Sequence, residues 1–352
     1  MPFLQIQARL HPPSVDLTGK IAIVTGANGG IGLETARQLL LLHAGTVVLA
    51  VRNMAKGEAA KSELLADKKI QGGNPAANIR VMKLDMADYQ SVWEFANSIK
   101  VDLPALHILI LNAAVANLPW SKTGSGHDQI SQVNYFSNVM LLLELLPTLE
   151  ATARRSGEPS RVTWVGSRSF LASKLSKSIR QESVIEFLDD PKKYGWFMRY
   201  PDSKLLSAAF VREFSKHQDP QTVVVNDMCP GMVDTSITHH APAYFRKPMA
   251  ALTKVTARTP EQGAWAVIHA AAMAGPDSHG KYLVDQKEIS SASQWPGQSS
   301  FADTGPRRSY GGLKSAQGQR LRLQLWKETA AEMVQQGVAL PAFMESFVAE
   351  DA

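Results

Sequence analysis

Short apolar runs rich in β-branched residues alternate with helix-like segments along most of the chain. The strand-like runs lie at residues 20–25, 46–51, 79–84, 106–111, 161–165, 222–225 and 282–284. The helix-like segments between them lie at residues 31–42, 54–66, 88–99, 133–149 and 205–216. This alternation is typical of βαβ units, whose right-handed crossovers place helices on both faces of a mostly parallel sheet. The sequence therefore predicts an α/β fold, with a single doubly wound parallel sheet in a three-layer αβα sandwich.

The strand–helix pattern continues from about residue 19 to residue 286 without a linker that would divide it. We therefore expect one main domain, although a chain of 352 residues could form two. The pattern is interrupted at residues 170–199, 232–259 and 290–312. The expected division is an N-terminal extension at residues 1–18, a main domain at 19–289, and a loop with a C-terminal helix at 290–352. An amphipathic helix at 314–336 should pack on or near the main domain.

Composition and charge exclude several classes of protein. With 45% hydrophobic and 20% charged residues, the chain can bury a core, which excludes wholesale disorder. The net charge is +5, but no basic run or basic stripe with interleaved aromatic residues is present, so no nucleic-acid partner is expected. Cys229 is the one cysteine, which rules out an intrachain disulfide and a cysteine-based zinc site. The side chains of His239 and His240 diverge because the two residues are adjacent, so no metal is expected.

The longest apolar stretches do not have the composition of membrane spans. Residues 103–120 are interrupted by prolines, asparagines and a histidine, and residues 264–274 fall short of the roughly 20 residues that a spanning helix needs. Residues 1–19 contain no apolar run of signal-peptide length. We therefore expect no membrane-spanning segment and a cytoplasmic location.

A glycine-rich turn follows the first predicted strand and opens a helix. It reads Thr-Gly-Ala-Asn-Gly-Gly-Ile-Gly at residues 25–32, and so has the spacing TGxxxGxG rather than GxGxxG. Glycines at such a turn let backbone N–H groups approach a pyrophosphate at the helix N-terminus. An ordinary loop is the alternative, but the position after the first strand favours a dinucleotide cofactor.

The end of the second predicted strand indicates which dinucleotide is bound. Residues 46–57 contain no acid that could bind the 2′-hydroxyl of NAD, and Arg52 stands just after the strand. A guanidinium group can bind the 2′-phosphate of NADP through two hydrogen bonds. The sequence therefore favours NADP(H) over NAD(H), with a solvent-exposed arginine as the alternative interpretation.

Tyr200 and Lys204 are four residues apart, so they share one face of a helix. An ammonium group beside a phenol lowers the pKa of the phenol and makes it a usable general acid or base. A surface pair without function is the alternative. Ser167 ends the fifth predicted strand, at the edge where doubly wound sheets form their sites, and Asn134 opens a long helix.

These motifs occur in the order that is typical of the short-chain dehydrogenase/reductase family, which the chain resembles over about residues 19–286. The order is a glycine-rich turn, Asn134, Ser167, Tyr-x-x-x-Lys at residues 200–204, and Pro-Gly at residues 230–231. More closely, the segments at 49–52, 199–204, 278–282 and 318–326 resemble the retinol-dehydrogenase-like group of filamentous fungi. The resemblance implies a Rossmann fold whose residues 19–289 form an NADP-binding catalytic domain.

The resemblance also implies the roles of individual residues. Asn134 would hold a water linked to Lys204, Ser167 would hydrogen-bond the substrate oxygen, and Tyr200 would transfer the proton. Lys204 would also hold the nicotinamide ribose together with Tyr200. The other residues expected at the cofactor are Gly26, Asn28, Gly30, Ile31, Gly32, Arg52, Asp85, Met86, Asn112, Ala113, Pro230, Gly231, Val233 and Thr235. Gly166 departs from the family pattern, which has serine there, and Ser169 is an alternative to Ser167.

The expected function is that of an NADP(H)-dependent oxidoreductase that reduces a ketone or aldehyde to an alcohol, or catalyses the reverse reaction. The aromatic pair Tyr244 and Phe245 and the fungal resemblance favour a lipophilic substrate and a role in secondary metabolism. Two alternatives remain: a redox-neutral isomerisation, dehydration or cyclisation, and a cofactor-binding protein without turnover. The expected partner is a small-molecule substrate, and a homo-oligomer is left open.

Overall fold

One sheet lies at the centre of the computed structural model, which describes residues 9–116, 119–179, 182–233, 257–289, 313 and 315–349. Eight strands of the described residues form it, in the order β3-β2-β1-β4-β5-β6-β7-β8. They are β1 (Ile21–Thr25), β2 (Thr46–Val51), β3 (Asn78–Lys83), β4 (Ile108–Leu111), β5 (Ser160–Val165), β6 (Val223–Cys229), β7 (Tyr282–Val284) and β8 (Lys287–Ile289). All neighbouring strands run parallel except β7 and β8, and this order confirms the predicted doubly wound sheet.

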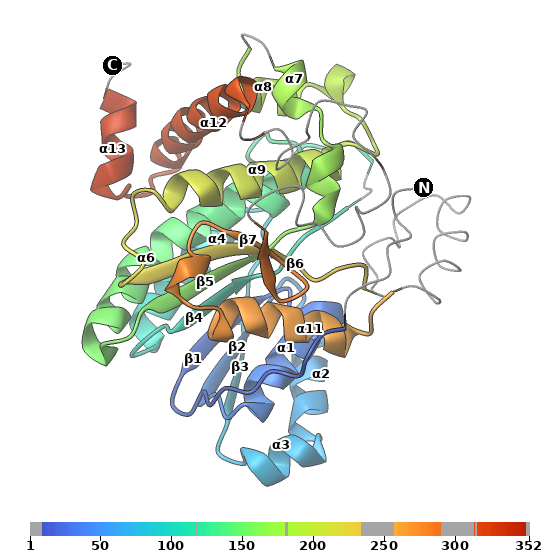
Figure 1. Ribbon diagram of the computed structural model, residues 1–352, viewed down its shortest axis with the longest axis vertical. Coiled ribbons are helices and arrows are strands. Elements are labelled where there is room, and N and C mark those ends of the chain that lie inside the picture. Colours follow the sequence, from blue (N-terminus) through green and yellow to red (C-terminus); the bar gives the residue numbers. More distant parts are fainter. Residues whose placement is uncertain are drawn as a thin grey trace.

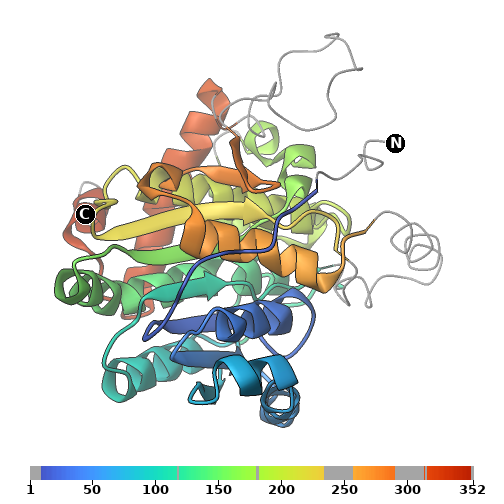
Figure 2. The ribbon, with the colours of Figure 1, turned by 60° about the horizontal axis from the view of Figure 1, so that its bottom comes forward.

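Helices cover both faces of the sheet. Those described are α1 (Gly30–Leu41), α2 (Met54–Leu65), α3 (Lys68–Gly73), α4 (Tyr89–Asp102), α5 (Gln129–Ser131), α6 (Ser137–Ser156), α7 (Leu175–Ser178), α8 (Val184–Asp189), α9 (Arg199–Phe214), α11 (Pro260–Ile268), α12 (Ala316–Gln335) and α13 (Ala342–Ala349). Figure 1 shows α4, α6 and α9 above the sheet, with α1, α2 and α11 below it. Figure 2 shows the same three layers from a second direction, with α12 outside the α9 layer.

Alternate residues of the central strands pack into two separate apolar clusters. In β1, Ile21 and Ile23 contribute to the cluster on the side of α4, α6 and α9. Ala22 and Val24 contribute to the cluster on the side of α1 and α11. Strands that are buried on both faces need apolar residues at every position, which is why they are visible in the sequence as continuous apolar runs.

The β7–β8 hairpin is an element that the sequence pattern does not predict. Its two turn residues, Asp285 and Gln286, have φ of 52° and 62°. Two left-handed residues in a row give the type I′ turn, whose twist matches that of the flanking strands. Such turns usually contain Asn or Gly, and β8 begins with Lys-Glu, so the local sequence carries no hairpin signal.

The C-terminal helix α12 packs against α9. Trp326 is buried, and its ring centroid lies 5.4 Å from that of Phe210 on α9. Leu321 and Leu325 are also buried, whereas Leu323 is 47% exposed, because residues two apart point to different sides of a helix. The C-terminal helix is therefore present near its predicted position, while the proposed division at residues 18 and 289 stays a prediction.

A carboxylate of α12 binds the start of α8, which lies in the segment that interrupts the predicted pattern. Glu328 accepts hydrogen bonds from Ser183 Oγ at 2.8 Å, Val184 N at 3.0 Å and Ile185 N at 2.9 Å. Ser183 is the N-cap residue of α8, so Glu328 satisfies backbone N–H groups that the helix itself leaves free. A charge at the positive end of the helix dipole further stabilises this arrangement.

His127 joins the same two regions through a second set of contacts. Its Nδ1 lies 2.8 Å from Asp189 Oδ2 in α8, and its Nε2 lies 3.0 Å from Glu332 Oε1 in α12. Burial lowers the pKa of His127, but the hydrogen bonds to the two carboxylates outweigh burial and raise the pKa to about 9. The imidazolium form is therefore the one that the fold stabilises.

We expect His127 to stabilise the fold in a pH-dependent way. Because the folded-state pKa exceeds the ordinary value of 6.5, its contribution is full below about pH 6.5 and is lost as the pH rises through about 9. His127→Gln should therefore lower the urea midpoint of unfolding more at pH 6 than at pH 10. His11→Gln, at an exposed position, is the matched control and should change neither midpoint. Equal losses for His127→Gln at both pH values would contradict the prediction.

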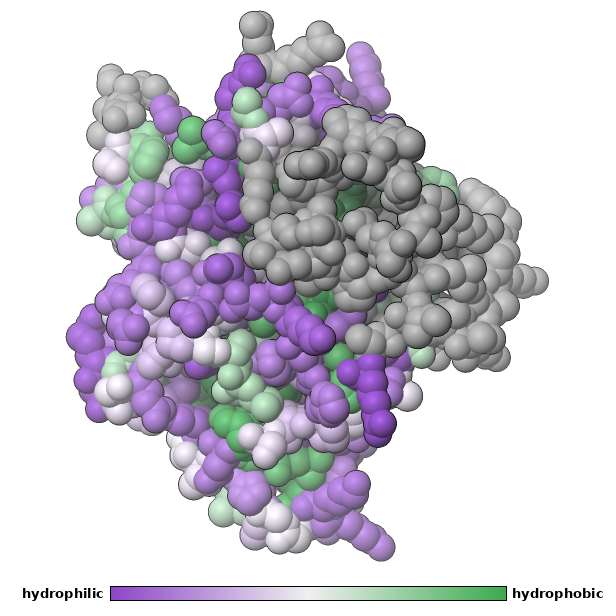
Figure 3. All heavy atoms as spheres, in the orientation of Figure 1, coloured by the Kyte–Doolittle hydropathy of each residue, from purple (hydrophilic) through white to green (hydrophobic). Residues whose placement is uncertain are grey.

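No helix of the described residues has both the length and the hydropathy needed to cross a bilayer. On the face shown in Figure 3, hydrophilic residues cover most of the coloured surface, and hydrophobic residues occupy small separate areas. Large hydrophobic side chains that are more than a third exposed include Leu65, Trp93 and Val334, which lie on three different helices.

Candidate functional site

The glycine-rich turn of residues 25–32 joins β1 to α1 at the carboxyl edge of the sheet. Gly26 and Gly30 have φ of 67° and 56°, which is the left-handed region that favours glycine. A Cβ on Gly32 would lie 2.4 Å from the carbonyl oxygen of Gly26 and 2.6 Å from Asn112 Nδ2. The start of α1 can therefore pack against the turn only because residue 32 has no side chain.

The first turn of α1 offers backbone N–H groups to a ligand. Its N-cap residue is Gly29, no side chain caps the helix, and the first turn contains no acid. A Cβ on Gly29 would meet no atom within 4 Å, so the space beside the helix end is open. Asn28 is exposed there and Ile31 is half-buried. Free N–H groups and the positive end of the helix dipole suit a pyrophosphate, so these residues fit a dinucleotide.

Asn112 ties the end of β4 to this turn. Its Nδ2 donates to Thr25 O at 2.8 Å, and its backbone N–H donates to Thr25 Oγ1 at 2.9 Å. The N–H of Ala113 donates to the same hydroxyl at 2.9 Å. The amide side chain of Asn112 therefore holds together two neighbouring strands, β1 and β4, at the point where the strand order reverses. Doubly wound sheets bind their ligands at the point where the strand order reverses.

The residues expected at the adenine end follow β2 and β3, which lie side by side and run parallel. Arg52 is exposed directly after the last residue of β2. The carboxylate of Asp85 accepts a hydrogen bond from Ala87 N at 3.0 Å, and Met86 is buried. The structure thus places Arg52, Asp85 and Met86 at the same edge of the sheet as the glycine-rich turn.

Tyr200, Lys204 and Ser167 come together between α9 and β5. The Ser167 side chain lies close enough to the Tyr200 hydroxyl to act on its pKa. The Lys204 Nζ lies 5.6 Å from the centroid of the Tyr200 ring and donates to Val165 O at 2.8 Å. Ser169 also lies near Ser167, but its buried Oγ has no hydrogen-bond partner among the described residues. The geometry therefore favours Ser167 over Ser169 as the hydroxyl that acts with Tyr200.

Burial has the largest effect on the pKa values of both Tyr200 and Lys204. It raises the pKa of the Tyr200 hydroxyl above its ordinary range, although the Ser167 side chain acts to lower the pKa. Burial also lowers the pKa of Lys204 to about 8, against the attraction of Asp227, which acts to raise it. The sequence analysis expected Lys204 to lower the pKa of Tyr200. Burial instead raises the pKa of Tyr200, and Lys204 is not among the described groups that act on it.

Asn134 lies in the π-helical turn η1 (Gln132–Phe136) that precedes α6. Its Oδ1 accepts from Val115 N at 2.8 Å, and its Nδ2 donates to Val115 O at 2.9 Å and to Ser203 Oγ at 3.0 Å. Ser203 Oγ in turn donates to the carbonyl oxygen of Tyr200 at 2.8 Å. Asn134 is thus connected to α9 through Ser203, and its expected water link to Lys204 stays a prediction.

The residues after β6 complete the carboxyl edge. Gly231 has a φ of 87°, and Pro230 O accepts a hydrogen bond from Arg258 Nη1 at 2.9 Å. A Cβ on Gly263 of α11 would lie 2.9 Å from Val233 Cγ2 and 3.4 Å from Ile31 Cγ1, so Val233 and Ile31 meet beside Gly263. Five residues named in the sequence analysis lie outside the described residues: Thr235, His239, His240, Tyr244 and Phe245.

Proteins with similar sequences match nearly the whole length of this chain. A family model described as short chain dehydrogenase matches residues 20–168. The short chain dehydrogenase yanD of Aspergillus niger is 42% identical over 97% of this chain and 99% of its own length. The chain belongs to the short-chain dehydrogenase/reductase family. The short-chain dehydrogenase/reductase tropG of Talaromyces stipitatus is also 42% identical, over 94% of this chain and 96% of its own. The predicted membership and the resemblance to fungal members are confirmed.

Solved structures with lower identity share the fold of this short-chain dehydrogenase/reductase. A 3-oxoacyl (acyl-carrier-protein) reductase from Agrobacterium tumefaciens, described with NADP bound, has a TM-score of 0.57 and 21% identity over 76% of this chain and 93% of its own. The NADH-dependent reductase A1-R′, described in complex with NAD, has a TM-score of 0.55 and 20% identity over 76% and 95%. The protein is an oxidoreductase of this family by its sequence relatives.

Asp227 also faces the site, and it is absent from the residues that the sequence analysis singles out. It lies inside β6, is buried, and acts on the charge of Lys204. The sequence does carry a signal for it, because a carboxylate within the apolar run at residues 223–229 needs a partner in the core.

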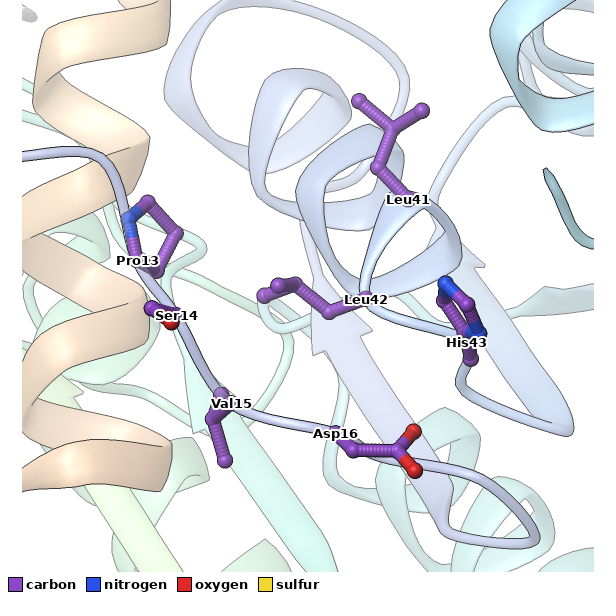
Figure 4. Close-up of a pocket in the computed structure, with 7 residues that line it drawn as sticks. All are labelled: Pro13, Ser14, Val15, Asp16, Leu41, Leu42 and His43. Atoms are coloured by element: carbon purple, nitrogen blue, oxygen red, sulfur yellow. The ribbon is translucent and has the colours of Figure 1, made fainter.

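A surface pocket of about 420 Å³ lies away from these residues (Figure 4). It is lined by residues 13–16, which precede β1, and residues 41–43, which follow α1. Both segments lie at the amino ends of the strands, opposite the edge that carries the glycine-rich turn and Tyr200. The pocket therefore has no part in the chemistry of the carboxyl edge.

Proposed function

We propose that this protein is an NADP(H)-dependent oxidoreductase that reduces a ketone or aldehyde to an alcohol, or catalyses the reverse, on a lipophilic small molecule. The observation that carries the proposal is that Ser167 and Tyr200 lie together beside the buried Lys204. This group lies at the carboxyl edge of the sheet, where the glycine-rich turn also lies and where doubly wound sheets bind their ligands.

In the proposed reaction each polar side chain has its own task. The nicotinamide cofactor, when bound, supplies or accepts the hydride. Ser167 hydrogen-bonds the oxygen of the substrate, and Tyr200 donates a proton to that oxygen in the direction of reduction. Lys204 holds a positive charge beside Tyr200 and stabilises the phenolate that is left. Asn134 supports α9 through Ser203 and, in this proposal, holds a water that returns the proton from solvent to Lys204.

The substrate class and the setting rest on analogy with the relatives. The most similar proteins come from filamentous fungi, which supports a role in secondary metabolism. The expected partner remains a small molecule rather than nucleic acid, and a cytoplasmic location and a homo-oligomer remain proposals.

The direct test is a screen of lipophilic ketones and aldehydes, in which NADPH absorbance and the product are followed together. We expect net consumption of NADPH with formation of the alcohol. Product without net consumption would support a redox-neutral reaction instead. Tight cofactor binding with no product from any substrate class would support a protein without turnover.

Arg52 should decide the choice of cofactor. It is the first charged residue after β2, it is exposed, and no carboxylate precedes it there. A charge-assisted pair with the 2′-phosphate should favour NADPH over NADH by about ten- to a hundredfold in kcat/KM. Arg52→Asp should remove or reverse that preference, because the new carboxylate repels the phosphate and accepts a hydrogen bond from the ribose of NADH.

The matched control for this prediction is Lys68→Asp. It makes the same change of charge at an exposed position in α3, on the side of the sheet where the strands begin. The ratio of kcat/KM for the two cofactors should stay at the wild-type value in this variant. A wild-type preference for NADH, or an unchanged ratio in Arg52→Asp, would refute the role of Arg52 without touching that of Tyr200.

A further inference from the structure

Asp227 is a carboxylate in the core whose oxygens have no hydrogen-bond partner. It is 2% exposed, and neither Oδ1 nor Oδ2 makes a hydrogen bond to the described residues. The backbone N–H groups of Met228 and Gly166 lie close enough to lower its pKa, but Gly166 N already donates to Met228 O at 2.7 Å. An isolated buried carboxylate is costly, so it needs a cation or a proton.

The carboxylate occupies the space that a side chain at residue 166 would fill. A Cβ on Gly166 would lie 2.1 Å from Asp227 Oδ1 and 2.9 Å from its Cγ. The two residues are neighbours because β5 and β6 pair with Val165 opposite Met228. The Asp227 carboxylate can therefore occupy this space only because residue 166 has no side chain.

Asp227 faces the same side of the sheet as the proposed catalytic residues. Alternate residues of β6, including Val225 and Cys229, pack into the cluster that contains α9, and Asp227 shares their direction. The Lys204 Nζ donates at 2.8 Å to the carbonyl oxygen of Val165, the residue before Gly166, and its charge acts on the Asp227 carboxylate. The other titratable groups around Asp227 and Lys204 are Tyr200 on α9, Cys229 on β6 and Tyr282 on β7. Tyr282 lies opposite Asp227 in the pairing of β6 with β7.

We propose that Asp227 is a positioning residue that acts through Lys204, as the buried counter-ion that keeps the Lys204 ammonium protonated beside Tyr200. This inference rests on the proposed function, in which a charged Lys204 supports proton transfer by Tyr200. Burial alone drives both groups toward their neutral forms, and the attraction between them opposes this change. Without the Asp227 carboxylate, burial would lower the pKa of Lys204 with no counter-ion to oppose it.

The test is the protonation of Lys204 in the protein without cofactor, which does not require turnover. NMR of protein labelled with [ε-13C]lysine gives the titration midpoint of Lys204, and the resonance is assigned by its loss in Lys204→Met. Asp227→Asn keeps the shape of the side chain and removes its charge. We expect the Lys204 midpoint to fall by about 1–3 pH units. The alkaline limb of the pH profile of kcat should move in the same direction.

The matched control is Asp285→Asn. Asp285 is also a buried carboxylate, at the end of the neighbouring strand β7, but its partner is Arg258 at 2.6 Å. This variant should leave the Lys204 midpoint at the wild-type value. An unchanged midpoint in Asp227→Asn overturns the counter-ion role, whatever the enzyme does with substrates. A shifted midpoint in a protein that reduces no carbonyl compound would support the ion pair and reject the proposed function.

A double variant decides the question if Asp227→Asn does not fold. Gly166→Ala alone should lower the melting temperature, because its Cβ collides with the Asp227 carboxylate. Gly166→Ala combined with Asp227→Ala removes the collision and should recover most of that loss. In this double variant the Lys204 midpoint should again lie below the wild-type value. A wild-type midpoint in the folded double variant would overturn the proposal.

Discussion

Tyr200→Phe should lower kcat for carbonyl reduction by about a hundredfold or more, with little change in the affinity for NADPH. The variant keeps the ring that lies beside Lys204 and removes the hydroxyl that lies near Ser167. A proton donor is lost while the packing of α9 is retained, so the effect should be on the chemical step. Steady-state kinetics and a cofactor titration by fluorescence measure the two quantities separately.

Two serine variants provide the matched comparison. Ser167→Ala removes the hydroxyl that lies near the Tyr200 hydroxyl and should also cause a large loss of kcat. Ser169→Ala removes a hydroxyl two residues away that has no hydrogen-bond partner among the described residues, and it should cost little. A larger loss from Ser169→Ala would show that the serine assignment is wrong, and near-normal turnover in Tyr200→Phe would exclude the proposed proton donor.

Gly32→Ala should weaken both the fold and the binding of the dinucleotide. The added Cβ would lie 2.4 Å from the carbonyl oxygen of Gly26, and a backbone atom in a tight turn has no room to retreat. Overpacking of this kind costs roughly 1–3 kcal/mol, and relief of the collision must displace the start of α1 from the turn. We expect a lower melting temperature and a dissociation constant for NADPH that is at least about tenfold higher.

The control for Gly32→Ala is the same substitution at Gly72. Gly72 lies exposed in α3, and a Cβ there would meet no atom within 4 Å. Alanine favours a helix over glycine, so Gly72→Ala should keep or slightly raise the melting temperature and leave cofactor binding unchanged. Equal behaviour of the two variants would mean that the turn tolerates a side chain at residue 32.

The central sheet could be predicted because its strands are buried on both faces. β2 and β7 have the bounds expected from the apolar runs, and four other predicted strands differ by one or two residues at their ends. The strand predicted at 222–225 is longer in the structure, where β6 continues to Cys229. α9 begins at Arg199, before the predicted segment 205–216, and Pro201 is accommodated because proline is tolerated in the first turn of a helix. The positions of the glycine-rich turn, Ser167, Tyr200 and Lys204 follow from this topology.

The remaining features depend on contacts between distant residues, which a local pattern does not contain. The turn at Asp285 and Gln286 adopts left-handed angles without glycine, so β8 had no local signal. The balance at Lys204 depends on burial and on Asp227, which is 23 positions away in sequence. The sequence analysis expected these groups to lie together, but the direction of the net shift in the pKa of Tyr200 required the structure.

The attachment of α12 to α8 limits how segments can be exchanged between members of the family. Glu328 accepts three hydrogen bonds from the start of α8, and His127 bridges carboxylates of α8 and α12. A chimera that receives only one of these two segments keeps charged groups whose partners have been replaced. α8 and α12 must therefore be transferred together, although they are encoded in two separate parts of the gene.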